Sequence, residues 1–125
     1  MARKGTPTLT EAELRVMNVV WKLGEASVND VLAVMPSKTR PAYNTVLTIM
    51  RILERKGYLE HAKEGRAYIY RPLVNRKGAR RRAVRHMISS FFEDSPRLLM
   101  LSLMEDEKIT PEELAQLKKM IEERG

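Results

Sequence analysis

The chain has 125 residues, and 23 lysines and arginines against 16 aspartates and glutamates give it a formal net charge of +7. It has no cysteine, which excludes disulfides, thiolate metal sites and a thiol nucleophile. Hydrophobic residues make up 43% of the chain, yet no apolar run approaches the roughly 18 residues that span a bilayer. The first residues also lack the apolar segment of a secretory signal. We therefore expect a cytoplasmic protein that does not insert into membranes and that binds a polyanion.

Two helices are predicted before residue 37. Thr10 and Glu13 have the spacing of a capping box, and Ser27 and Asp30 repeat the pattern. The apolar residues of the first helix at helical spacing are Leu14, Met17, Val20 and Trp21. Those of the second helix are Val28, Val31, Leu32 and Met35. Pro36 is expected to end the second helix.

A third helix is expected to open with Pro41 near its first position and to run to about Lys56, with Gly57 as its stop. Its polar face carries Asn44, Thr48, Arg51 and Arg55. Its apolar face carries Ala42, Val46, Ile49, Met50 and Leu53. Amide, hydroxyl and guanidinium groups read base edges in the major groove of DNA, and Leu47 at the rim could meet a thymine methyl. The helix is therefore a candidate recognition helix; the alternative is an ordinary solvated helix face.

Residues 58–72 change from helical to alternating period. We expect a strand over Leu59–Lys63, a turn at Glu64 and Gly65, and a second strand over Arg66–Arg71. Three helices followed by a short hairpin is the element order of a winged helix-turn-helix.

Basic side chains gather in the hairpin and directly after it. Lys63 and Arg66 lie at the predicted tip, where contacts to the phosphate backbone would set register and affinity. Tyr68 and Tyr70 alternate along the second strand, and at least one of them is expected simply to cover the sheet. Residues 76–85 hold six basic and no acidic side chains, and we expect some of them to approach DNA phosphates.

The rest of the chain is predicted to form three helices: one over 76–93, one starting at Ser95 and Pro96, and one starting at Thr110 and Pro111. The apolar residues expected to mediate dimerisation are Val84, Met87, Ile88, Phe91, Leu99, Leu103 and Leu117. A segment of about 50 residues cannot bury so many large side chains against itself. Pairing with an identical copy about a two-fold axis is therefore expected, and packing back on the front domain is the alternative.

These elements predict a mainly α protein with a small β-hairpin. A winged-helix DNA-binding domain would cover residues 1–73, and a helical dimerisation domain would cover residues 74–125. In this interpretation the chain is a sequence-specific DNA-binding protein, and its two-fold dimer would bind a palindrome.

An enzymatic function is disfavoured. His61 and His86 lie on different predicted elements, with no third ligand at a metal-site spacing. The chain has no glycine-rich phosphate loop, and no serine with a base and an orienting group. We expect no catalytic residue, no metal and no cofactor. The alternative function is a basic RNA-binding or ribosome-associated protein, which would need exposed aromatics, whereas only 6% of the residues are aromatic.

Three segments in combination resemble the penicillinase repressor family, the Bla/Mec-type winged-helix regulators. They are Leu9 to Trp21, Asn44 to Gly57, and Lys63 to Tyr70. The leucine-rich Leu98–Leu103 stretch and the final acidic helix extend the resemblance over nearly the whole chain. The resemblance implies a homodimeric repressor on a palindromic operator. The candidate DNA-binding residues are Tyr43, Asn44, Thr45, Leu47, Thr48, Arg51, Arg55, Lys63 and Arg66.

The resemblance also implies how repression is relieved in some members. A membrane sensor metalloprotease acts with them, and the repressor is cleaved at an Asn-Phe bond in the leucine-rich helix. The matching positions here are Ser102 and Leu103, which are the candidate cleavage site and depart from that pattern. The copper-responsive branch carries a C-terminal cysteine motif, so the absence of cysteine excludes copper sensing by that route. Ile52 stands where some members carry a basic residue, so the operator preference is expected to differ.

Overall fold

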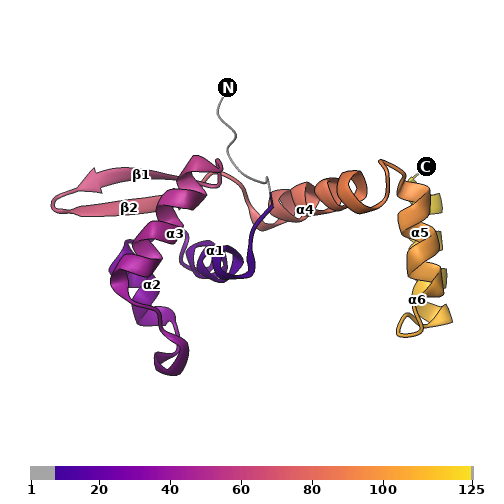
Figure 1. Cartoon of the computed structure of the whole chain (residues 1–125), viewed down its shortest axis with the longest axis horizontal. Helices are drawn as coiled ribbons and strands as arrows, with labels where there is room; N and C mark the ends of the chain where they lie inside the picture. Colours follow the sequence, from indigo (N-terminus) through magenta and orange to yellow (C-terminus); the bar gives the residue numbers. More distant parts are fainter. Residues whose placement is uncertain (1–7, 125) are drawn as a thin grey trace. The chain divides into compact units, whose positions relative to one another are not determined.

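The structure, a computed structural model, describes residues 8–124 (Figure 1). Its elements are α1 (Glu11–Leu23), α2 (Val28–Val34), the 3₁₀ helix η1 (Ser37–Thr39), α3 (Tyr43–Arg55), β1 (Leu59–Glu64), β2 (Ala67–Pro72), α4 (Arg76–Phe91), α5 (Pro96–Glu105) and α6 (Pro111–Arg124). The predicted fold class, mainly α with a small hairpin, is confirmed. The chain forms two compact units, one up to Val84 and one from Arg85, so the division falls inside α4. The functional boundary between residues 73 and 74 stays a prediction.

Reciprocal hydrogen bonds open the first two helices, as predicted. The Thr10 hydroxyl accepts from the backbone N–H of Glu13 at 3.2 Å, and the Glu13 carboxylate accepts from the Thr10 N–H at 3.0 Å. Ser27 and Asp30 make the same exchange at 3.1 and 3.0 Å. The pattern recurs at the start of α6. These bonds satisfy backbone donors that a helix N-terminus leaves unpaired, and each cap contributes about 1 kcal/mol.

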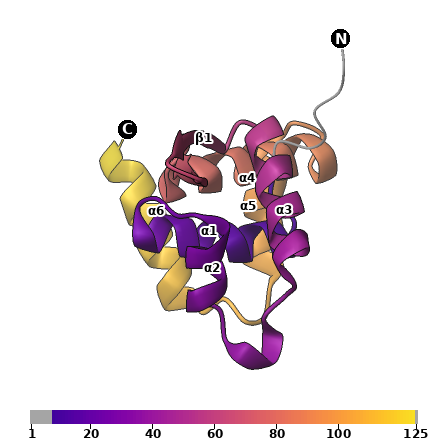
Figure 2. The ribbon, with the colours of Figure 1, turned by 90° about the vertical axis from the view of Figure 1, so that its left-hand side faces the viewer.

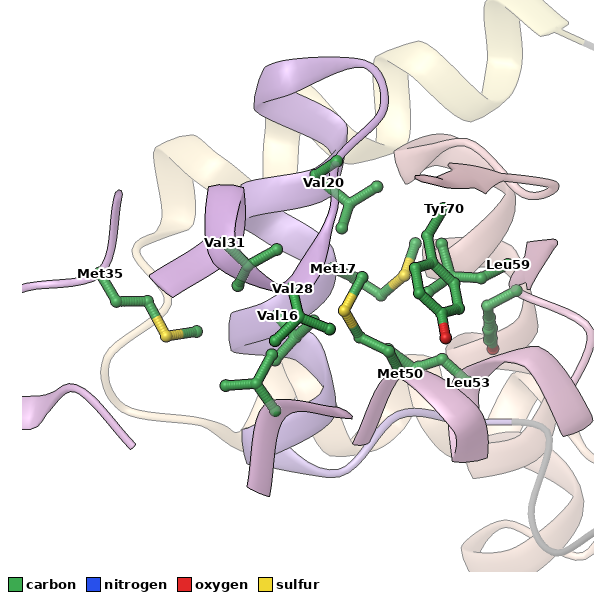
Figure 3. Close-up of a cluster of buried hydrophobic side chains, with 13 residues drawn as sticks. Val16, Met17, Val20, Val28, Val31, Met35, Met50, Leu53, Leu59 and Tyr70 are labelled. Atoms are coloured by element: carbon green, nitrogen blue, oxygen red, sulfur yellow. The ribbon is translucent and has the colours of Figure 1, made fainter. Parts of the chain in front are cut away.

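The first unit has one hydrophobic core, to which α1, α2, α3 and the hairpin contribute (Figure 3). Its buried residues are Val16, Met17, Val20, Ala26, Val28, Val31, Met35, Val46, Met50, Leu53, Tyr58, Leu59 and Tyr70. Full burial of one such large side chain contributes roughly 1.5–3 kcal/mol. The shared core therefore holds α3 and the hairpin in a defined arrangement.

Two residues assigned to the apolar faces of predicted helices are exposed in the structure. Leu14 is 41% exposed, and Glu13 takes an inward position in its place because its carboxylate pairs with Lys56 inside the unit. Ala42 is exposed because it is the extended N-cap of α3, with φ −69° and ψ 157°. Pro41 precedes this cap, so α3 starts slightly later than the sequence suggested.

The hairpin turn lies one residue later than predicted. Glu64 pairs with Ala67, which leaves Gly65 and Arg66 as a two-residue loop. Gly65 has φ 63°, and two-residue hairpin turns of type II′ place a glycine at this first loop position. Arg66 is consequently a loop residue at the tip rather than the first residue of a strand.

The two tyrosines of β2 have different environments. Tyr70 is 2% exposed and belongs to the core, whereas Tyr68 is 46% exposed. The prediction that at least one of them covers the sheet is therefore confirmed. Tyr70 also exchanges two backbone hydrogen bonds with Ala26, at 2.8 and 2.9 Å, which joins the turn between α1 and α2 to the hairpin.

The second unit contains the end of α4 with α5 and α6. Ser95 caps α5 and Pro96 occupies its first turn, as predicted. No described residue from 85 to 124 is fully buried. Large apolar side chains are instead exposed, with Phe91 at 78% and Met104 at 61%. Among the described residues, no helix combines the length and the apolar character needed to cross a membrane.

Candidate nucleic-acid interface

The outer face of α3 is polar and open to solvent. Tyr43, Asn44, Thr45, Thr48, Arg51 and Arg55 are all exposed. Val46, Met50 and Leu53 on the opposite face are completely buried, which fixes the rotation of the helix about its axis. Leu47 lies between the two faces, half-buried against the core. Figure 2 views the first unit from the side of the hairpin tip, and α3 runs beside the hairpin there.

An open groove of about 570 Å³ lies between the start of α2, one edge of α3 and the hairpin. Its lining residues are Ser27, Val28, Asn29, Tyr43, Leu47, Arg51, Lys63, Glu64, Arg66, Ala67, Tyr68 and Tyr70. The groove brings together five predicted DNA-binding residues from two separate elements. Three come from α3 and two come from the hairpin tip.

The groove has an excess of positive charge. Arg51, Lys63 and Arg66 supply three cations, and Glu64 supplies one carboxylate. Tyr43 and Tyr68, which are 48% and 46% exposed, add accessible phenol groups beside them. Cations and hydroxyl donors on a concave surface suit the phosphate and sugar groups of a nucleic acid.

The other predicted contacts lie outside the groove. Asn44, Thr45, Thr48 and Arg55 are exposed on α3 but do not line it. The surface of α3 therefore has two parts. Tyr43, Leu47 and Arg51 form the edge of the groove, and the exposed amide, hydroxyl and guanidinium groups of the other four residues lie outside it.

The start of α2 is a part of the groove that sequence reasoning missed. Ser27 and Asn29 line it beside Tyr43. The capping pattern at Ser27 locates the start of α2 along the chain. Only the packing of α2 against α3 brings that start to the groove.

The hairpin is attached to α3 through His61. The His61 Nδ1 lies 2.8 Å from both carboxylate oxygens of Glu54 on α3. The imidazole ring also packs on Tyr68 and Tyr70, with centroid distances of 4.9 and 5.5 Å. His61 is therefore structural, and it helps to place the exposed Tyr68 ring.

Burial raises the pKa of the Tyr70 phenol above its ordinary value of 10.0, and the nearby charge of Glu54 adds to the shift. The phenol therefore stays neutral at physiological pH, where it keeps its proton for hydrogen bonding.

An ion pair joins the end of α3 to α1. The Lys56 Nζ lies 2.7 Å from Glu13 Oε1 and also donates to the Thr8 carbonyl at 3.1 Å. Both side chains are only 8% exposed. The pair fixes the end of α3 opposite to the groove edge at Tyr43. Over residues 8–124 no group of three or more histidines or carboxylates is placed to hold a metal ion.

The predicted dimerisation residues lie on the three helices after the hairpin. Val84, Phe91 and Leu117 are exposed, and the remaining four are half-buried: Met87, Ile88, Leu99 and Leu103. Ser102 and Leu103, the candidate cleavage site, lie inside α5.

A family model described as Penicillinase repressor matches residues 9–123 of this chain. The chain belongs to the penicillinase repressor family. It is 28% identical over 120 residues to the penicillinase repressor of Bacillus licheniformis, covering 96% of this chain and 94% of that one. It is 22% identical over 119 residues to the methicillin resistance regulatory protein MecI of Mammaliicoccus sciuri, covering 95% and 97%.

A solved structure supports the same assignment. The solution structure of the DNA binding domain of the repressor BlaI is similar at 33% identity and a TM-score of 0.52, and the match covers 61% of this chain and 93% of that one. The resemblance and the winged-helix fold predicted from the sequence are thereby confirmed. This member of the penicillinase repressor family is a DNA-binding transcriptional repressor, and the family is not one of enzymes.

Proposed function

We propose that this repressor acts in the cytoplasm, where it binds a palindromic operator as a homodimer, with one winged helix on each half-site. The single observation that carries this proposal is the groove in which Arg51 of α3 meets Lys63 and Arg66 of the hairpin tip. With α3 in the DNA major groove and the basic hairpin on the adjacent phosphate backbone, both sides of the protein groove would contact DNA.

In this proposal, α3 and the hairpin tip have different roles. Exposed groups on α3 read base edges: Asn44, Thr45, Thr48, Arg51 and Arg55, with Leu47 beside a thymine methyl. Lys63 and Arg66 bind phosphates, which adds affinity and salt dependence without sequence preference. Tyr43 donates its hydroxyl at the groove edge.

Dimerisation is supported by the exposed apolar surface of the second unit. No described residue between 85 and 124 is fully buried, although Phe91, Met104, Met120 and Ile121 each leave more than half of their area open. Exposed apolar patches of this kind mark association surfaces in soluble proteins. A second copy of the chain, related by a two-fold axis, would bury this apolar surface against the same surface of its own.

A competition experiment at several salt concentrations tests duplex binding against the RNA-binding alternative. The wild-type chain is titrated into a labelled operator duplex with single-stranded DNA or an RNA hairpin as competitor. We expect the duplex to win by at least about 1,000-fold, with affinity falling steeply as salt rises. Equal competition by single strands or RNA would contradict the proposal.

Relief by proteolysis is a second part of the proposal. A membrane sensor metalloprotease would lead to cleavage within α5, where Ser102–Leu103 is the candidate bond although it departs from the Asn-Phe pattern; such a cut removes the end of α5 and all of α6. The remaining chain would keep its winged helix but lose part of the apolar surface. A chain truncated after Ser102 is therefore expected to sediment as a monomer and to bind a half-site only. A truncated chain that still dimerises on the full operator would contradict this mechanism.

A further inference from the structure

One face of the hairpin carries two cross-strand pairs of polar and aromatic side chains. His61 is paired with Tyr70, and Lys63 is paired with Tyr68 one step nearer the tip. Directly opposed residues of two strands point to the same face, and alternate residues of one strand share it. Since Tyr70 belongs to the core, this is the face that the hairpin turns towards the helices.

A contact between His61 and Glu54 joins this face to α3. The His61 Nδ1 lies 2.8 Å from both carboxylate oxygens of Glu54, so this nitrogen carries the proton and donates it. The two side chains are 37% and 34% exposed, so water weakens the interaction. Residues 60–64 of β1 are all exposed, and the hairpin extends beyond the helices of the first unit (Figure 1). Because a two-stranded hairpin has little stability of its own, the contact supports it where it leaves the core.

The His61 ring also supports Tyr68 in the groove. The two ring centroids lie 4.9 Å apart and the ring planes are inclined by 41°, an arrangement within the favourable range for aromatic pairs. Tyr68 is 46% exposed and lines the groove together with Arg51 and Lys63. The phenol ring is therefore held beside two cations while nearly half of its surface stays accessible.

We propose that Tyr68 is a further DNA-contacting residue, which donates its hydroxyl to a backbone phosphate, and that His61 and Glu54 are positioning residues that hold its ring in the groove. The role of Tyr68 rests on the proposed use of the groove for DNA. A phenol hydroxyl donates one hydrogen bond and carries no charge, so it adds affinity without releasing counterions. In this respect it differs from Lys63 and Arg66, which neutralise phosphates.

Protonation of His61 strengthens this positioning. Imidazole is the side chain that ordinarily changes charge between pH 5 and 8. A proton added at Nε2 places an imidazolium against the Glu54 carboxylate, and such a charge-assisted hydrogen bond is stronger than a neutral one. The other charged or titratable side chains on the facing surfaces are Arg51, Lys63, Tyr68 and Tyr70. Side chains of these types titrate well above pH 8. Operator affinity should therefore rise as the pH falls from 8 to 6.

Binding titrations with the full-length chain test these roles. The variants are Tyr68→Phe, His61→Gln and Glu54→Gln. His86→Gln is the matched control, because His86 is the second of the two histidines and lies on α4. The probes are a duplex that the wild type selects from a random pool and an unrelated duplex of equal length. Affinity is measured over a salt series at pH 7, and at pH 6 and pH 8 at fixed ionic strength.

Tyr68→Phe should weaken binding to both duplexes by about tenfold, as expected for a lost hydrogen bond to a charged group. Its salt dependence should match that of the wild type. Wild-type affinity in this variant, or a flattened salt dependence, would overturn the role of Tyr68. His61→Gln should weaken binding by about threefold. Combining it with Tyr68→Phe should add little to the loss from Tyr68→Phe alone, because His61 acts through Tyr68. Full additivity of the two losses would overturn the positioning role.

The pH dependence separates positioning from direct attraction to DNA. The wild type and His86→Gln should bind about threefold more tightly at pH 6 than at pH 8, and His61→Gln should lose this response. Glu54→Gln and Tyr68→Phe should lose it as well, since both residues are needed for the effect. A pH response that survives in Glu54→Gln would mean that the imidazolium attracts DNA directly, and it would overturn the positioning role.

Two further results keep the test decisive. If His61→Gln does not melt cooperatively, Glu54→Gln carries the same prediction, and a wild-type pH response in that variant would refute it. Arg66→Ala is measured on both duplexes to separate this inference from the proposed function. Unchanged affinity in Arg66→Ala would refute the role of the hairpin in DNA binding. Weaker binding by Arg66→Ala together with wild-type binding by Tyr68→Phe would overturn only the role of Tyr68.

Discussion

The substitution Lys56→Met is expected to cost the winged-helix unit about 3–5 kcal/mol of unfolding free energy. Methionine keeps the reach of the side chain but leaves the Glu13 carboxylate without a cation. That carboxylate is 8% exposed, so water replaces little of the lost interaction. Its remaining donor is the Thr10 N–H at 3.0 Å.

The size of the effect follows from the burial of the pair. At an effective dielectric constant near 20, two charges 2.7 Å apart attract by about 6 kcal/mol. Desolvation offsets much of this attraction, so the intact pair contributes little net stability. When Lys56 is removed, Glu13 still bears its desolvation cost but loses the attraction.

The exposed pair between Arg71 and Glu25 is the matched control. It has a similar distance of 3.1 Å, but its side chains are 49% and 52% exposed. Arg71→Met should therefore cost less than about 1 kcal/mol.

Urea unfolding at pH 7, followed by the fluorescence of Trp21, measures both changes. Loss of 3–5 kcal/mol would remove a large share of the roughly 5–15 kcal/mol typical of a domain. Adding Glu13→Gln to Lys56→Met should recover part of the loss, because no bare charge is then buried. If Lys56→Met costs no more than Arg71→Met, the account of this pair is wrong.

Three further predictions concern DNA binding, assembly and pH. Arg51→Ala should weaken operator binding by about 1–3 kcal/mol and relax the sequence preference. Arg66→Ala should weaken binding to all duplexes alike and flatten the salt dependence. Identical behaviour of the two variants in binding titrations would refute the separate roles of α3 and the hairpin tip. Phe91→Asp should yield monomers in sedimentation, and an unchanged dimer would move the interface elsewhere. Because Tyr70 keeps its proton longer in the folded state, the stability it contributes is present below pH 10 and is lost as pH rises further. Tyr70→Phe should reduce this alkaline loss in urea midpoints between pH 8 and 11.5, and Tyr68→Phe should not.

Local sequence signals predicted the element starts well. The capping hydrogen bonds join residues three positions apart, Thr10 with Glu13 and Ser27 with Asp30. They depend only on the local helix start and not on the rest of the fold. The hairpin was predicted for the same reason, although the turn was misplaced by one residue at Gly65.

Contacts between distant residues could not be predicted in this way. Lys56 is 43 positions from Glu13, so no local pattern indicates that the two side chains form an ion pair. Helical periodicity counts Leu14 among the apolar residues of α1, whereas the structure exposes Leu14 and buries Glu13. The backbone bonds between Ala26 and Tyr70 likewise require the completed fold. Periodicity describes one element at a time, whereas these contacts depend on how the elements pack.

The same distinction applies to the candidate interface. The spacing along α3 predicted an exposed polar strip that includes Arg51, since that strip needs only the helix itself. The groove needs the hairpin and the start of α2 beside α3, so Asn29 was missed. Composition showed a basic run, but only the folded structure shows that Arg76 contacts the Trp21 ring and Arg82 the Tyr58 ring.

Selection of binding sites from random-sequence duplexes by the full-length chain tests whether this repressor reads a palindrome as a dimer. We expect enrichment of one inverted repeat, bound by two chains per duplex, with Arg51→Ala altering the preference in both arms. Enrichment of a sequence without two-fold symmetry, or no enrichment above a random pool, would contradict it.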